Sequence, residues 1–253
     1  MKFKIFIINL DRSTERYQHA LAQLASWPDL PIERVSAADG RSMSEQQLNQ
    51  YYSLALNTKH YHKLLKPGEK GCYISHIWCW QRIVEQDLDF ALILEDDFII
   101  QTDLAALLET IGRLNTPWHY LKLAMPNKAQ PVLAREALTS QYSLVHYKKH
   151  PVSTVAQAVS KAGAQLLLAK AVPFYRPVDV MLQYHFELGI DATGIQPQPF
   201  RPELEFESNI YSKNSEGLNR LLFYKNRLYY FWQIFRHNLT RYGLKSVFMR
   251  NND

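Results

Sequence analysis

The strongest constraint in this sequence is a run of five apolar residues, 90–94, that ends directly in three acidic residues, Glu95, Asp96 and Asp97. A short, unbroken apolar run of this kind is typical of a β-strand that is buried on both faces. Charged residues at the end of such a strand lie at the edge where open α/β sheets bind ligands. The pattern therefore predicts an α/β fold with a polar site at the end of this strand.

The three carboxylates predict a metal site. Side chains alternate along a strand, so Glu95 and Asp97 are expected to face one way and Asp96 the other. Carboxylate oxygens suit a hard divalent cation, and we predict that Glu95 and Asp97 hold Mn²⁺ or Mg²⁺ with a substrate phosphate completing the shell. The competing interpretation is a solvated acidic loop, because acidic triplets are common on protein surfaces.

Length and composition indicate a folded protein with a full core. The chain has 253 residues, of which 47% are hydrophobic and 21% charged, and no apolar stretch approaches the ~20 residues that span a bilayer. The segment 1–10 lacks a small-residue cleavage site, so it is expected to form a first strand. Cys72 and Cys79 lie about 10 Å apart along a predicted helix, too far for a disulfide. The two cysteines do not require an oxidising compartment, so we expect a cytoplasmic protein.

The net charge of +5 is concentrated in the last 36 residues. Residues 218–253 carry seven basic side chains and one acidic side chain, whereas the rest of the chain carries 22 and 23. Nine aromatic residues lie among these cations. The composition predicts a basic amphipathic helical tail that docks on an anionic membrane surface. The alternative is a helix that packs on the body or on a second subunit, which would make a homodimer. Nucleic acid is not expected, since the body has no net positive charge and no recognisable nucleic-acid module.

Strand and helix patterns alternate along the body. We expect strands over 2–9, 32–36, 90–94, 120–123, 142–147 and 154–159, with helices over 14–25, 44–51, 72–86, 104–113, 163–170 and 178–186. Residues 53–67 are expected to form a loop. This alternation is typical of one α/β domain, and we place it at 1–202, followed by a linker or mobile loop at 203–217 and the helical tail at 218–253.

An ordered set of motifs resembles glycosyltransferase family 25, which adds sugars to bacterial lipooligosaccharide and, in animals, to collagen. The likeness spans about residues 3–200, and its segments are 7–16, 35–40, 68–76, 92–97, 163–164 and 177–179. The resemblance implies a GT-A fold, that is, a Rossmann-type mixed sheet flanked by helices. It also implies a nucleotide-diphosphate sugar donor and inversion at the anomeric carbon. Many GT-A enzymes carry Asp-x-Asp where this chain has Glu-Asp-Asp, which leaves open which two carboxylates touch the metal.

Residues around the first strand and helix are candidates for donor binding. Asn9 ends the first predicted strand, and Arg12 and Arg16 lie four residues apart around the following helix start, where they could grip base and phosphate. The alternative is that the two arginines are surface charges that pair with Glu15 or Asp11.

Further donor-side candidates lie in the other motifs. The resemblance favours a donor-side loop at Asp39 and Gly40, which could also be a plain turn. Ser75 and His76 lie one turn into a helix that a glycine-rich turn opens, so this helix start could face the donor. Asp96 would serve the ribose or support the loop.

Cys72, His76 and Cys79 share one predicted helical face, which raises the hypothesis that they bind zinc. Zinc needs four ligands at tetrahedral angles, and one straight helix rarely supplies three of them. A buried polar histidine or a donor contact is therefore the preferred interpretation of His76.

An inverting transfer needs a general base that deprotonates the acceptor hydroxyl. Asp179 is our candidate, because it begins a helix after Pro177 and matches the Pro-x-Asp position of the family. The alternative is a routine helix cap. His185 could be a third metal ligand, but six residues of unbroken helix would turn it about 120° away from Asp179.

The sequence thus predicts a metal-dependent inverting glycosyltransferase at the inner face of a bacterial inner membrane. It would move a hexose from a UDP-sugar to a lipooligosaccharide acceptor. Galactose is favoured because the family most often transfers it, and glucose is next. The alternatives are a metal-dependent phosphohydrolase, which would use several carboxylates in a two-metal site, and a non-catalytic sugar-nucleotide or glycan-binding module.

Overall fold

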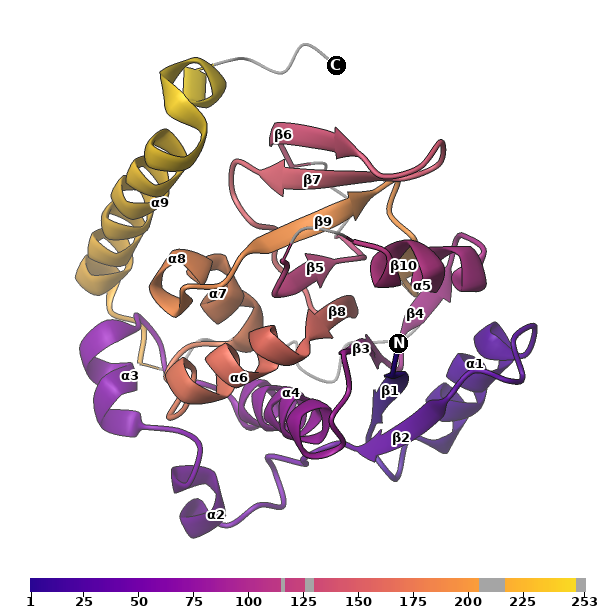
Figure 1. Ribbon diagram of the computed structural model, residues 1–253. Helices are drawn as coiled ribbons and strands as arrows, with labels where there is room; N and C mark the ends of the chain where they lie inside the picture. Colours follow the sequence, from indigo (N-terminus) through magenta and orange to yellow (C-terminus); the bar gives the residue numbers. More distant parts are fainter. Residues whose placement is uncertain (115–116, 126–129, 205–216, 249–253) are drawn as a thin grey trace.

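A computed structural model describes residues 1–114, 117–125, 130–204 and 217–248 (Figure 1). Among these residues, eight strands form one central sheet in the order β2-β1-β3-β8-β5-β9-β7-β6, and two short strands, β4 and β10, pair separately. The strands of the large sheet are β1 Phe3–Asn9, β2 Ile32–Ser36, β3 Phe90–Glu95, β5 Tyr120–Lys122, β6 Val132–Ala137, β7 Ser143–Tyr147, β8 Ala156–Ser160 and β9 Ala192–Gln196. The short pair consists of β4 Phe98–Ile100 and β10 Phe200–Pro202.

Helices cover both faces of this sheet (Figure 1). They are α1 Thr14–Leu24, α2 Glu45–Asn49, α3 Leu54–His60, α4 Pro67–Glu85, α5 Leu104–Gly112, α6 Lys161–Lys170, α7 Val178–Gln183, α8 His185–Leu188 and α9 Arg220–Phe248. The side chains of β3 alternate between two cores, as a strand buried on both faces requires. Ala91 and Ile93 pack with α4 and α6, whereas Leu92 and Leu94 pack with α1 and α5.

The sheet is mixed. β1 pairs in parallel with both β2 and β3, while β8 runs antiparallel to β3 and to β5. β9 is parallel to β5, and β7 is antiparallel to β9. The expected α/β mixed sheet flanked by helices is thereby confirmed.

The chain leaves β1 toward β2 on one side, and β3 lies on the other side of β1. Such a reversal opens a crevice outside the carboxyl ends of the two strands. Ile8 is paired with Glu95 in this register, so Asn9 and the acidic residues meet at the same edge. The site predicted from β3 therefore lies at the switch point of the sheet.

Several elements differ from the sequence expectation. Residues 54–60 form the helix α3 where a loop was expected, because the Ser53 hydroxyl accepts a hydrogen bond from the Leu56 amide and caps it. The helix α4 begins at Pro67, five residues earlier than expected, with the proline in its first turn. The helix expected over 178–186 breaks at Tyr184 into α7 and α8. The strands β4, β6, β9 and β10 were not predicted.

The tail forms the helix α9, as predicted, and one of its faces packs on the body. Tyr230 and Ile234 are buried against Tyr184, and the Asn238 side chain donates to the Lys148 carbonyl. Figure 1 shows α9 alongside α3 and α8. Body packing, the alternative considered for the tail, is therefore realised on this face. No helix of the described residues is both long and apolar enough to cross a membrane. The proposed linker falls mostly on 205–216, outside the described residues, so the division of the chain stays a prediction.

Two glycines let the loop after β2 lie directly on the start of α4. A Cβ on Gly40 would come 2.0 Å from the Pro67 carbonyl oxygen, and one on Gly71 would come 2.3 Å from the Ala38 carbonyl oxygen. The Ser75 hydroxyl, which is fully buried, completes this contact by accepting from the Ala38 amide at 2.9 Å. Only glycine allows backbones to approach this closely.

We expect Gly71→Ala to lower the free energy of unfolding by about 1–3 kcal/mol, the usual cost of overpacking a close contact. The midpoint of urea unfolding measures this loss. Gly112→Ala is the matched control, because its Cβ would meet only the end of the Met1 side chain, which is exposed and can move. Equal stability of the two variants would contradict the close approach.

Candidate functional site

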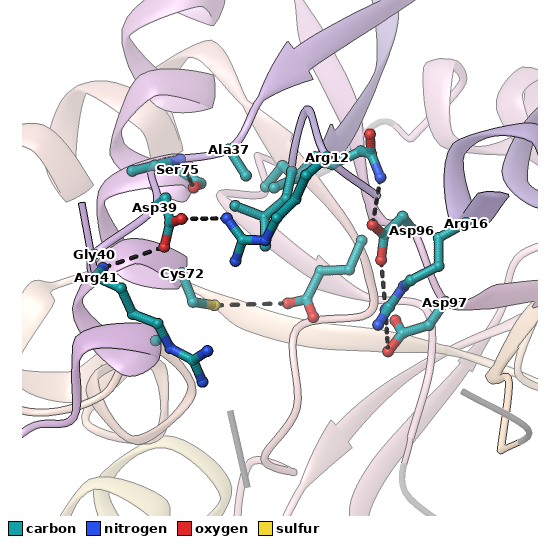
Figure 2. Close-up of a pocket in the computed structure, with 16 residues that line it drawn as sticks. Arg12, Arg16, Ala37, Asp39, Gly40, Arg41, Cys72, Ser75, Asp96 and Asp97 are labelled. Atoms are coloured by element: carbon teal, nitrogen blue, oxygen red, sulfur yellow. Dashed lines mark hydrogen bonds and ion pairs between the residues drawn. The ribbon is translucent and has the colours of Figure 1, made fainter. Parts of the chain in front are cut away.

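A pocket lies at the carboxyl ends of β1 and β3 (Figure 2). Its walls come from the end of β1, the start of α1, the loop at residues 37–41, the first turns of α4 and the acidic triplet. Most of the residues predicted for donor and metal binding line it. Two predicted residues, His76 and Asp179, are not among its lining residues.

Arg16 binds two of the three acidic side chains. Its guanidinium lies 2.5 Å from an Asp96 carboxylate oxygen and 3.1 Å from one of Asp97 (Figure 2). Asn9 donates a hydrogen bond of 2.6 Å to the other oxygen of Asp96. Arg16 and Asn9 thus hold Asp96 from the side of β1 and α1, which fits the supporting role considered for this residue.

Glu95 lies in a different environment, between β8 and α4. One of its oxygens accepts a 2.5 Å hydrogen bond from the Thr154 hydroxyl and lies 3.3 Å from a ring nitrogen of His76. The other ring nitrogen of His76 lies 2.9 Å from the Gln157 amide. His76 is fully buried behind Glu95, so this histidine orients the carboxylate.

Strand alternation does not extend through the triplet. β3 ends at Glu95, and Asp96 and Asp97 form a turn before β4. Within this turn Asp96 and Asp97 share Arg16. The assignment of Glu95 and Asp97 to the metal therefore needs support other than the alternation from which it was predicted.

The electrostatics of the triplet provide that support. Burial, followed by the negative charge of Glu95, raises the pKa of Asp97 to about 7. One Asp97 oxygen, Oδ1, is buried and has no hydrogen-bond partner in the part of the chain that the structure describes. For Glu95 burial acts in the same direction, but hydrogen bonds from His76 and Thr154 outweigh it and lower the pKa. Crowded carboxylates with an unpaired oxygen fit a bound divalent cation.

Cys72 also lies beside this cluster. The potential ligand atoms of Cys72, His76 and Glu95 all lie within 4.8 Å of one another. Burial and the charge of Glu95 raise the pKa of the Cys72 thiol, which disfavours the thiolate form that binds metals. Cys79, the third residue of the zinc hypothesis, is buried in the core on the same helix. The chemistry of the site therefore favours a hard cation on carboxylates.

The opposite wall of the pocket carries the other basic candidates. Arg12 forms an ion pair with Asp39, and the Asp39 carboxylate also accepts from the Arg41 amide at 3.2 Å (Figure 2). Burial acts to raise the pKa of Asp39, but hydrogen bonds from both arginines outweigh it and lower the pKa. The guanidinium of Arg34 donates to Asn9 at 2.6 Å. An anionic ligand in this pocket would face Arg12 on one wall and Arg16 on the other.

Asp179 lies in the first turn of α7 and is tied to the segment between β7 and β8. One carboxylate oxygen accepts from the Ser153 amide at 3.3 Å, and the other accepts from the Val180 amide at 2.8 Å. The charges of Asp179 and Glu95 act together on Cys72 and on Lys122. The structure thus brings Asp179 into the electrostatic surroundings of the triplet.

His185 is separated from this site. The break at Tyr184 places it in α8, where its ring packs 5.0 Å from that of His237 on α9. Burial and the charge of His237 lower the pKa of His185 to about 3. The charges that act on it come from around α9 and not from the triplet, so the structure gives no support to a metal-ligand role.

Four residues that contact the predicted site were missed by sequence reasoning: Arg34, Lys122, Thr154 and Gln157. Arg34 and Gln157 lie on strands and show no motif of their own. Lys122 lies within the strand expected over 120–123, and Thr154 begins the strand expected over 154–159. A lysine inside an apolar strand pattern was the only signal available. Their roles depend on strand neighbours that the sequence does not specify.

The sequence matches the model of a known family, described as glycosyltransferase family 25 (LPS biosynthesis protein), over residues 2–182. Procollagen galactosyltransferase 2 of Mus musculus is 28% identical over 188 residues, which cover 71% of this chain and 29% of the relative. A glycosyltransferase 25 family member of Drosophila melanogaster is 26% identical over 211 residues, which cover 81% of this chain and 34% of the relative.

A third relative carries a different description. The probable inactive glycosyltransferase 25 family member 3 of Bos taurus is 27% identical over 194 residues, which cover 73% of this chain and 32% of the relative. This chain spans about a third of the length of the curated relatives that it matches.

Solved structures are more distant. A crystal structure of A197 from STIV superposes with a TM-score of 0.45 at 8% identity, covering 85% of this chain and 100% of that chain. A structure of an active-site mutant of LgtC gives a TM-score of 0.39 at 10% identity, covering 83% of this chain and 92% of that chain. At these TM-scores the likeness supports no inference about function.

Proposed function

The chain belongs to glycosyltransferase family 25, and we propose that it transfers a hexose from a UDP-sugar to a lipooligosaccharide acceptor with inversion at the anomeric carbon. Galactose is the favoured sugar, since matched relatives are named procollagen galactosyltransferases, and glucose is next. The family description as an LPS biosynthesis protein supports the choice of acceptor.

One observation carries this proposal. The acidic triplet lies at the switch point of the sheet, and one buried oxygen of Asp97 has no hydrogen-bond partner among the described residues. Arg12 and Arg16 line the same pocket as the triplet. Crowded carboxylates that suit a cation, in one pocket with arginines that could exchange their carboxylate partners for phosphate, fit a metal-bound diphosphate.

Glu95 and Asp97 would hold Mn²⁺ or Mg²⁺. Bound there, the cation would offset the negative charge that develops on the departing diphosphate. Arg12 and Arg16 would bind the phosphates, while Asn9, Asp39 and the loop at Gly40 would contact the nucleoside. Ser75 supports that loop through the Ala38 amide.

Asp179 would be the general base. In the proposed step its carboxylate takes the proton from the acceptor hydroxyl, whose oxygen forms a bond to the anomeric carbon. The bond from that carbon to the phosphate oxygen breaks, and its electrons leave with UDP. The hydrogen bond from the Ser153 amide to Asp179 would hold the carboxylate in position.

We expect the purified protein with Mn²⁺ to hydrolyse one member of a UDP-sugar panel slowly, and EDTA to stop this hydrolysis. Asp97→Asn should lower the rate by on the order of 100-fold or more, the scale of losing one charge-stabilising group. Asp87→Asn is the matched control, because Asp87 is exposed and, within the described residues, forms an ion pair only with Lys161.

Each other outcome has a clear meaning. Hydrolysis that survives full chelation would contradict the metal site. Release of phosphate from simple esters would indicate a phosphohydrolase. Binding of UDP without any turnover would indicate a non-catalytic module. One matched relative is itself described as a probable inactive member of the family.

We also propose that the outer face of α9 docks the enzyme on the anionic cytoplasmic leaflet, where a lipid-linked acceptor would lie. Leu221, Leu228 and Trp232 are 82%, 72% and 59% exposed, although they are large and apolar. They recur at intervals of seven and four residues, so they share the helical face opposite Tyr230 and Ile234. The exposed cations Lys225 and Arg236 lie on the same helix. An apolar stripe flanked by cations fits an anionic lipid surface.

Leu228→Glu should reduce co-sedimentation of the full chain with phosphatidylserine-containing vesicles at least several-fold, because it places a charge in the apolar stripe. Raised salt should weaken binding of the unmodified chain as well. Leu204→Glu is the control, since Leu204 is 68% exposed and lies outside α9. Equal retention of both variants would exclude this face as the docking surface.

A further inference from the structure

Lys122 is a buried cation that has no role in the proposed transfer step as described above. It ends β5, and only 1% of its surface is exposed. Its ammonium group donates a hydrogen bond to the Ser153 carbonyl. Burial lowers the pKa of Lys122 to about 8, while the charges of Asp179 and Glu95 act in the opposite direction. Burying a lysine costs free energy that an apolar side chain would not, so its burial with a hydrogen bond to the Ser153 carbonyl points to a function.

The segment that Lys122 contacts is itself strained. Ser153 has a φ of 76°, a left-handed conformation that residues other than glycine rarely adopt. Strained backbone of this kind persists where the surrounding structure holds it in place, and it is concentrated at functional sites. Here Lys122 supplies one of the contacts that hold Ser153.

The same segment donates hydrogen bonds to both the proposed general base and a proposed metal ligand. The Ser153 amide donates to Asp179, and the hydroxyl of the next residue, Thr154, donates to Glu95. Two consecutive residues therefore connect the proposed base on α7 to the proposed metal ligand on β3. Thr154 is 5% exposed, so its hydroxyl has little competition from water.

We propose that Lys122, Ser153 and Thr154 form a bridge that fixes the distance between Asp179 and Glu95, with Lys122 and Thr154 as positioning residues for the transfer step. This inference rests on the proposed function. Transfer requires the acceptor hydroxyl on Asp179 and the donor diphosphate near Glu95 to meet in line, and a misplacement of about 1 Å can cost about 100-fold in rate. Lys122 and Thr154 touch neither substrate in this scheme, so they affect the rate of transfer more than donor binding.

The test compares kcat and the KM for the UDP-sugar in variants of the full chain. Thr154→Val keeps the shape of the side chain and removes only the hydroxyl, and we expect kcat to fall about 10- to 100-fold while KM changes less than about threefold. Thr154→Ser restores the hydroxyl and should recover most of the rate. Thr193→Val is the matched control, because Thr193 is also buried and its hydroxyl has no partner among the described residues.

Lys122→Met removes the ammonium group that donates to the Ser153 carbonyl. It should likewise lower kcat and leave KM nearly unchanged. If Lys122→Met does not fold, the Thr154 series decides. A kcat within about twofold of wild type in Thr154→Val would overturn the bridge, as would a Thr154→Ser variant as slow as Thr154→Val. A wild-type protein that turns over no UDP-sugar would instead end the proposed function itself, and this inference with it.

Discussion

Three carboxylates crowded at the end of one buried strand are the constraint on which the rest of the site depends. Their mutual repulsion and their burial favour any positive charge or hydrogen-bond donor that can reach them. Arg16 and Asn9 reach Asp96 from one side, and Thr154 and His76 reach Glu95 from the other. Asp97 keeps one buried oxygen that accepts no hydrogen bond from any described residue. This incomplete neutralisation gives the site its affinity for a cation in our account.

The fold supplies the walls that such a cation would need. The reversal of strand order beside β1 opens the crevice, and the close approach of residues 38–40 to the start of α4 places basic and polar groups along it. Asp179 enters from α7, on the face of the sheet that α4 and α6 cover. Its link to Glu95 runs through the connection between β7 and β8. Elements far apart in sequence thus converge on one polar edge.

Local sequence signals predicted the elements that carry their own pattern. The apolar run of β3 predicted its double burial, which the structure confirms. The helix expected over 44–51 is present as α2, and Ser44 and Gln47 form a capping box at its start. Features that depend on neighbouring strands could not be predicted from the local sequence. β6 has an exposed end and β9 is buried along most of its length, so neither shows a clear alternation. The contacts of Arg16, His76 and Lys122 depend on which strands lie side by side, and no local pattern determines that order.

A structure determined with UDP and Mn²⁺ bound would test the central claim most directly. Our account predicts the cation between Glu95 and Asp97, with diphosphate oxygens completing its shell and Arg12 and Arg16 turned toward the phosphates. A nucleotide bound elsewhere, with Arg16 still paired to Asp96 and Asp97 and no cation at either Glu95 or Asp97, would contradict it.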